Sequence, residues 1–207
     1  MKRKFCWLAL LLTALLPACM GGILPKAPDR ASYALPEPEA LHARKPLPAA
    51  LLVELPQASL ALSGTDVVVM RADGEVQVLP QVRWVAPAPQ LLQDLIARQI
   101  EVAGGAPAVA RSAQAYGLPL RLTINLLAFE LRERPGALSA HAAVSLRLVC
   151  AADARILATS QALAVDAEPV PDSPAAATAA LRDAAGVLAR QVLFWLDKVD
   201  ASACPLD

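Results

Sequence analysis

Apolar and polar residues alternate along two long stretches in the second half of the chain. In residues 118–126 leucine or isoleucine occupies every second position, and proline, arginine, threonine or asparagine lies between. Residues 141–150 repeat the pattern. Because successive side chains of a strand point to opposite faces, this period of two predicts long strands. Turn sequences at 134–137 (Arg-Pro-Gly-Ala) and 151–154 (Ala-Ala-Asp-Ala) then predict an antiparallel meander over residues 118–165.

Two helices and a hairpin complete the predicted domain. Residues 87–103 begin with two prolines, carry apolar residues three and four apart, and stop at a glycine pair. Residues 181–199 carry a second apolar stripe of helical spacing. Residues 66–71 and 75–79 flank an Asp-Gly turn, which is typical of a hairpin. This order predicts an α+β fold, with a mostly antiparallel sheet and two main helices packed on one face.

The N-terminus has the composition of an export signal. Residues 2–4 are basic, residues 5–16 are apolar apart from one threonine, and Leu-Pro-Ala-Cys follows directly. This order is typical of a secretory signal peptide, and its last four residues resemble the lipobox of bacterial lipoproteins. We expect residues 1–18 to be removed between Ala18 and Cys19, and Cys19 to be lipidated. The alternative is an ordinary signal peptide with a cysteine nearby.

A lipid on Cys19 would fix where the protein works. Each buried methylene contributes about 0.8 kcal/mol, so a diacylglyceryl group on the thiol and a palmitate-type chain on the amine form a stable anchor. Met20 follows instead of aspartate. By resemblance to enterobacterial sorting, this residue favours the outer membrane over the inner one. We therefore expect a lipid-anchored protein of the cell envelope that faces the periplasm.

Beyond the signal, the chain divides into a tether, a domain and a tail. Residues 19–48 carry six prolines and are predicted to form an extended tether behind the lipid. Residues 49–200 are predicted to form the domain and residues 201–207 a tail. Loss of the signal leaves 16 basic and 19 acidic residues, a net charge of −3. Nucleic acid is therefore not an expected partner.

Two cysteines remain for other roles. Cys6 leaves with the signal and Cys19 carries lipid, which leaves Cys150 and Cys204. In an oxidising periplasm these two form a disulfide if their Cα atoms lie within about 7 Å. The alternative places Cys150 in the core of a strand and Cys204 loose in the tail. The sequence leaves both alternatives open.

No pattern of residues indicates catalysis or metal binding. His42 lies in the tether and His141 lies on a predicted strand, so neither belongs to a ligand cluster. Metalloprotease, Cys-x-x-Cys and serine-elbow motifs are absent from the sequence. Glu130 and Glu133 form either an acid–base couple or, as we expect, solvated charges at the mouth of a hairpin. We predict a non-enzymatic protein without cofactor or metal.

The order of short motifs resembles the ABC-type transport auxiliary lipoprotein family, whose members include the PqiC-like lipoproteins. The segments that carry the resemblance are Tyr33-Ala34-Leu35, Val53-Glu54-Leu55-Pro56, Val68-Val69-Met70-Arg71, Arg83-Trp84 with Pro87, and Leu122 to Glu130. The resemblance implies an auxiliary component of a lipid transport system. Its partners would be an ABC transporter and an MCE-domain protein that carries apolar molecules between the inner and outer membranes.

Two questions stay open at this level. Arg83 and Trp84 are our first choice for a partner contact, but Trp84 can equally cap the core where hairpin meets helix. Two other functions compete with transport assistance. One is an adaptor or activator of another envelope machine, such as a cell-wall synthase. The other is direct lipid carriage in a groove lined by Leu127, Phe129 and Leu131.

Overall fold

A computed structural model describes residues 30–111 and 117–205. Its centre is a hairpin of two long strands, β8 (Leu120–Arg134) and β9 (Ala137–Cys150). The two strands pair antiparallel from Leu120 opposite Cys150 to Arg134 opposite Ala137. Strands β10 (Ile156–Thr159), β11 (Leu163–Asp166) and β12 (Val170–Pro171) follow and pair antiparallel with β9. The predicted meander is thereby confirmed.

An irregularity in β8 explains why its apolar pattern changes along its length. Before it, the even-numbered residues are buried, and Leu122 and Ile124 are fully inaccessible. The register shifts between Leu126 and Ala128, which moves the odd-numbered residues to the core side. Phe129 is buried after the shift, whereas Leu127 remains half exposed. Both parities therefore turn apolar in the sequence at the place where the strand is bulged.

The β8–β9 turn requires glycine at one position. Gly136 has a φ of +68° and nothing within 4 Å of the place where a Cβ would lie. We expect Gly136→Ala to lower the free energy of unfolding by about 1 kcal/mol, because an L-residue in this conformation is strained. Gly64 lacks a positive φ and is a matched control: Gly64→Ala should change stability little. Urea titration measures both, and equal effects would contradict the strain argument.

The opposite edge of β8 carries parallel strands. β2 (Leu51–Val53), β3 (Gln57–Ala58) and β4 (Val68–Met70) lie one after another along β8, all parallel to it. β7 (Val109–Ala110) pairs parallel with β2, and a short 3-10 turn, η2 (Leu60–Leu62), separates β3 from β4. β5 (Val76–Val78) pairs antiparallel with β4 and confirms the predicted hairpin.

The prediction of a mostly antiparallel sheet is wrong, because the sheets are mixed. Besides the three parallel partners of β8, the pairs β2–β7 and β1–β6 are also parallel. For the strands that pair parallel with β8, and for the pair β2–β7, the cause is the connection through α2 (Ala88–Val102), which separates β2, β3 and β4 from β7 and β8. A helical crossover returns the chain in the same direction, so it joins parallel strands.

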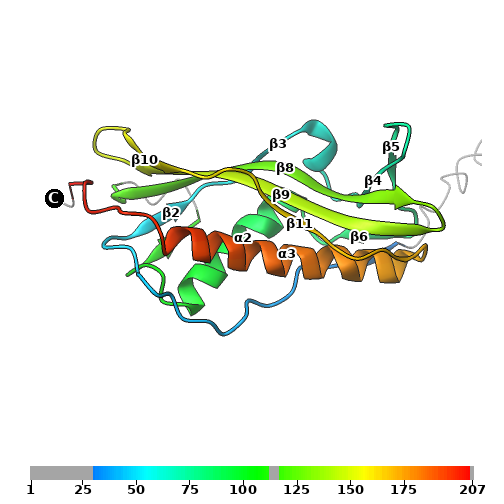
Figure 1. Ribbon diagram of the computed structural model, residues 1–207, viewed down its shortest axis with the longest axis horizontal. Helices are drawn as coiled ribbons and strands as arrows, with labels where there is room; N and C mark the ends of the chain where they lie inside the picture. Colours follow the sequence, from blue (N-terminus) through cyan, green and yellow to red (C-terminus); the bar gives the residue numbers. More distant parts are fainter. Residues whose placement is uncertain (1–29, 112–116, 206–207) are drawn as a thin grey trace, which may run out of the picture.

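Both helices lie against the same side of the sheet (Figure 1). α2 begins after Pro87 and ends at Ala103, where Gly104 takes a positive φ. α3 (Pro174–Leu196) begins at Ser173, whose hydroxyl accepts a hydrogen bond from the Ala176 amide at 3.2 Å. Their inward faces join the core residues of β8 and β9. In the part of the chain that the structure describes, neither helix meets the length and apolarity needed to cross a bilayer.

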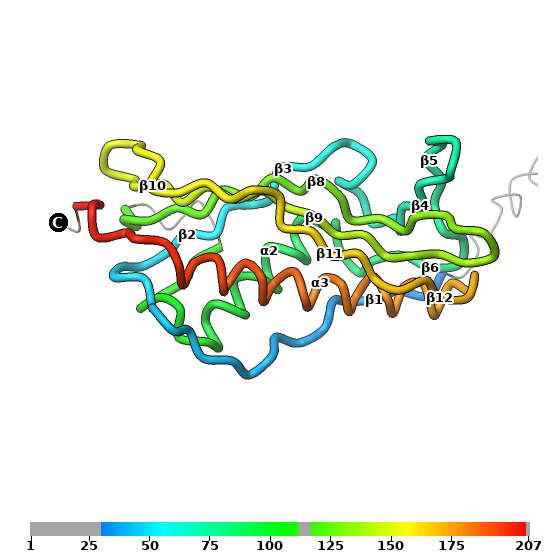
Figure 2. Tube along the Cα trace, in the orientation of Figure 1, coloured from blue at the N-terminus to red at the C-terminus, as the bar shows by residue number. Residues whose placement is uncertain are grey.

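The described chain begins at the end of the molecule that holds β12 and the β8–β9 turn (Figure 2). β1 (Ala31–Tyr33) pairs parallel with β6 (Val82–Trp84). Residues 34–48, called the strap here, then run beneath both helices to β2 at the other end (Figures 1 and 2). The strap belongs to the segment predicted as a tether, yet Leu35 and Leu47 are buried in the core.

Candidate functional site

The two residues chosen from the sequence as a partner contact point to opposite sides of β6. Trp84 is 1% exposed and stacks on Phe129 of β8, with ring centroids 5.4 Å apart. It therefore belongs to the core and presents no surface to a partner, which is the alternative that the sequence left open. Arg83 is exposed on the outer side of β6. Arg83 and the residues around it therefore remain as the candidates for a partner contact.

Three arginines from different parts of the chain gather around β1. Arg30 forms an ion pair with Asp66 at 2.7 Å and donates to the carbonyl of Val82. Arg83 donates from Nε to the hydroxyl of Ser32 at 3.0 Å. Arg182 of α3 donates from Nε to the carbonyl oxygen of Ala34 at 2.7 Å. We call Arg30, Arg83 and Arg182 the arginine row.

Val85 extends the arginine row with an apolar residue. Its backbone amide donates to the carbonyl of Tyr33, and its side chain is 55% exposed. Val85 has the same parity as Arg83 and so lies on the outer side of β6. The surface is therefore basic with an apolar margin.

The strap is held to α2 and α3 by a succession of polar contacts. Glu39 forms an ion pair with Arg190 of α3 at 2.7 Å. The backbone amides of Arg44 and Lys45 both donate to one carboxylate oxygen of Asp197. Farther along, the strap amides of residues 43 and 47 donate to backbone carbonyls at the end of α2. The strap thus connects the C-terminal end of α2 with the C-terminal half of α3.

Gln99 makes the most specific of these contacts. Its amide oxygen accepts from the backbone nitrogen of Glu39 at 3.0 Å, and its Nε2 donates to the carbonyl of the same residue at 2.9 Å. Gln99 is 1% exposed, so both groups are removed from water. A buried glutamine on a helix gives no sequence pattern that points to this role.

We expect Gln99→Ala to lower the free energy of unfolding by about 1–3 kcal/mol, because two buried hydrogen bonds are lost. Gln90→Ala, at an exposed position of the same helix, is the control and should shift stability by less than about 0.5 kcal/mol. Urea titration gives both values, and trypsin cleavage after Arg44 reports detachment of the strap. Indistinguishable variants would show that Gln99 does not hold it.

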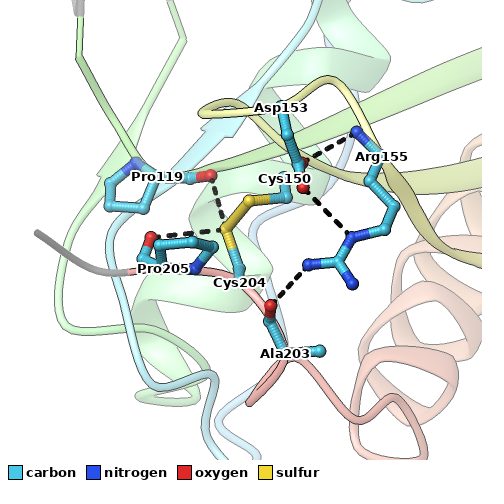
Figure 3. Close-up of a disulfide and its surroundings, with 7 residues drawn as sticks. All are labelled: Pro119, Cys150, Asp153, Arg155, Ala203, Cys204 and Pro205. Atoms are coloured by element: carbon cyan, nitrogen blue, oxygen red, sulfur yellow. Dashed lines mark hydrogen bonds and ion pairs between the residues drawn. A yellow bond between two sulfur atoms is a disulfide. The ribbon is translucent and has the colours of Figure 1, made fainter.

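Cys150 and Cys204 are joined by a disulfide, with Cα atoms 5.4 Å apart (Figure 3). Both cysteines are buried, Cys150 at the end of β9 and Cys204 in the segment after α3. Arg155 supports the same segment by donating to the carbonyl oxygen of Ala203 at 2.6 Å (Figure 3). The bond therefore fastens the end of the described chain to the end of the central hairpin that lies opposite the β8–β9 turn.

The remaining polar residues singled out in the sequence serve the sheet. Glu130 is paired with Arg132 at 3.2 Å, and His141 Nδ1 lies 2.7 Å from Asp166 of β11. Glu133 is paired with Arg71 of the β4–β5 side at 2.8 Å. The two glutamates are thus held by separate arginines and do not form a couple. Within residues 30–111 and 117–205, no group of three or more His, Cys, Asp or Glu is arranged to hold a metal.

The groove considered for direct lipid carriage is not formed by its three predicted residues. Phe129 and Leu131 are 1% and 0% exposed and lie in the core, whereas Leu127 is 49% exposed. The bulge in β8 separates them. Ala18 and Cys19, the predicted cleavage and lipidation residues, lie outside the described residues.

Comparison with solved structures finds the same fold in other proteins. A crystal structure of a Xanthomonas campestris protein of family DUF330 is 26% identical, with a TM-score of 0.71, over 80% of this chain and 94% of that one. A second crystal structure, of an uncharacterized protein, is 17% identical with a TM-score of 0.61 and covers 81% of this chain and 98% of that one. The second likeness is one of fold alone. No curated protein matches the sequence.

The larger part of the chain matches one protein family. Residues 33–193 match the family described as ABC-type transport auxiliary lipoprotein component. The match begins at Tyr33 of β1, includes the strap, Arg83 and Arg182, and ends inside α3. It confirms the resemblance given by the short motifs. The chain belongs to the ABC-type transport auxiliary lipoprotein family.

Proposed function

We propose that this protein is a non-enzymatic lipoprotein, anchored by Cys19 in the outer membrane and facing the periplasm. There it serves an ABC transport system that moves lipid between the inner and outer membranes. Its protein partners are the MCE-domain protein and the ABC transporter of that system. The domain itself supplies a fixed binding surface, and the apolar cargo travels through the partner.

The family match over residues 33–193 is the observation that carries this proposal. The family description names a transport auxiliary lipoprotein, and the first residues of the chain have the order expected of a lipoprotein signal. The buried polar groups described above are engaged in structural pairs, which supports a binding role over catalysis. The strap supports anchoring, because it ties the lipid-proximal side of the chain to both helices.

The test is affinity capture of the full-length protein from detergent extract after mild crosslinking. An MCE-domain protein should be recovered with it. Capture of a cell-wall synthase in its place would favour the adaptor alternative, and recovery of neither would contradict the transport proposal.

A Cys19→Ala variant tests the anchor separately. We expect it to leave the membrane fraction and to lose lipoprotein processing, since acylation needs the thiol. A variant that is processed normally and stays in the membrane would contradict lipidation. A Cys150→Ala variant, examined in parallel, should remain acylated and membrane-bound.

A further inference from the structure

We propose that the face formed by β1 and β6, with the arginine row at its centre, lies against the anionic lipid surface of the membrane that holds Cys19. The inference rests on the proposed lipidation and adds to it a second contact between domain and bilayer. The partners of Arg83 are then the phosphate groups of anionic lipids. Four observations carry it.

The first is the charge of this face. Arg30 directly precedes β1, Arg83 donates to Ser32 in β1, and Arg182 donates to Ala34 just after it, so the contacts span about 13 Å of extended chain. Asp66 is paired with Arg30. No carboxylate among the described residues forms an ion pair with Arg83 or Arg182. Guanidinium groups bind phosphate through paired N–H donors, so the unneutralised positions suit lipid headgroups.

The second observation is the orientation of the nearby acid. Asp183 follows Arg182 in sequence but lines the hollow between the strap and α3, where Glu39 and Arg190 are also found. Its side chain therefore lies on the strap side of α3. The outer side of β6 keeps a net positive charge with the apolar side chain of Val85 beside it.

The third observation is the length of chain between the face and the lipid. The strap holds residues 34–48 against the helices, and only residues 20–29 lie between Cys19 and Arg30. Eleven Cα steps from Cys19 to Arg30 reach at most about 40 Å. A fully unattached tether to residue 49 would reach about 100 Å. The strap therefore keeps β1 near the bilayer.

The fourth is that the connection ends at the arginine row itself. Arg30 is the first member of the row and follows Cys19 by eleven residues. A short connection gives its two ends an effective concentration in the millimolar range. A contact too weak to hold a free protein would therefore still be formed by the anchored one.

The test uses residues 19–207 carrying Cys19→Ala, so that no lipid on the protein contributes to binding. Sedimentation with vesicles of equal parts phosphatidylcholine and phosphatidylglycerol should show binding that weakens as salt is added. Vesicles of phosphatidylcholine alone should bind less. Each basic residue near a charged surface contributes about fivefold in affinity, so Arg83→Ala should weaken binding by about that factor, and Arg83→Lys should restore it.

Arg147→Ala is the matched control. Arg147 is exposed on β9, on the sheet face away from the helices, and should leave vesicle binding unchanged. Equal binding to both kinds of vesicle, or equal losses for Arg83→Ala and Arg147→Ala, would overturn the inference. So would unchanged vesicle binding by Arg83→Ala together with lost recovery of the MCE-domain protein, which would assign the face to a protein. Because the assay contains no lipidated protein, its failure is distinguishable from failure of the Cys19 proposal.

Discussion

Replacing both Cys150 and Cys204 by alanine is expected to lower the free energy of unfolding by about 4 kcal/mol. The bond closes a loop with a sequence separation of 54 residues, and a cross-link of this length removes much conformational freedom from the unfolded chain. The loop contains β10, β11, β12 and α3. The variant should keep the fold, because alanine replaces two buried sulfur atoms without adding a polar group.

Urea titration of the oxidised protein and of the variant measures this difference. A reducing agent should bring the wild-type protein to the stability of the variant and leave the variant unchanged. Because the disulfide belongs to an oxidising compartment, protein made in a reducing cytoplasm should show the lower value. An unchanged midpoint on reduction would contradict the contribution assigned to the bond.

The long hairpin could be predicted because its pattern is local. Each apolar residue of residues 120–126 lies opposite an apolar residue of β9, so the two alternating patterns support the same register. The turn sequence then fixes the direction of the second strand. Even the change of parity after Leu126 is visible in the sequence, although only the structure shows that a bulge causes it.

The parallel edge could not be predicted in the same way. β2 and β4 have three residues each and meet β8 across separations of more than sixty residues. Short apolar strands carry no period that fixes direction or partner. Turn sequences predict hairpins only. The parallel pairing of β2, β3 and β4 with β8 depends instead on the crossover through α2.

The strap shows what composition does and does not indicate. Its prolines predict an extended segment, and residues 34–48 are extended. Whether such a segment is free or docked depends on single partners far away in the sequence, such as Gln99 and Asp197. The division at residue 48 stays a prediction of domain limits, while Leu35 and Leu47 pack in the core. Cys19 and its lipid stay a prediction as well.

Trp84→Ala is expected to lower the free energy of unfolding by about 3–5 kcal/mol. The indole is among the largest fully buried side chains and joins β6 to β8 through its stack on Phe129. Its removal leaves a cavity between these strands and ends the aromatic pair. Trp84→Phe should lower the free energy of unfolding by less, because an aromatic ring remains stacked on Phe129.

Arg83→Ala is the matched control for Trp84→Ala, because the two residues are adjacent on β6 and point to opposite sides. The Arg83 side chain is exposed and donates from Nε to the hydroxyl of Ser32, so its loss should change stability by less than about 0.5 kcal/mol. The effects on vesicle binding should be the opposite. Binding should weaken for Arg83→Ala and should be unchanged for Trp84→Phe under conditions where that variant is folded. A large loss of stability for Arg83→Ala would place this arginine in the framework of the domain and remove it from the membrane-facing surface.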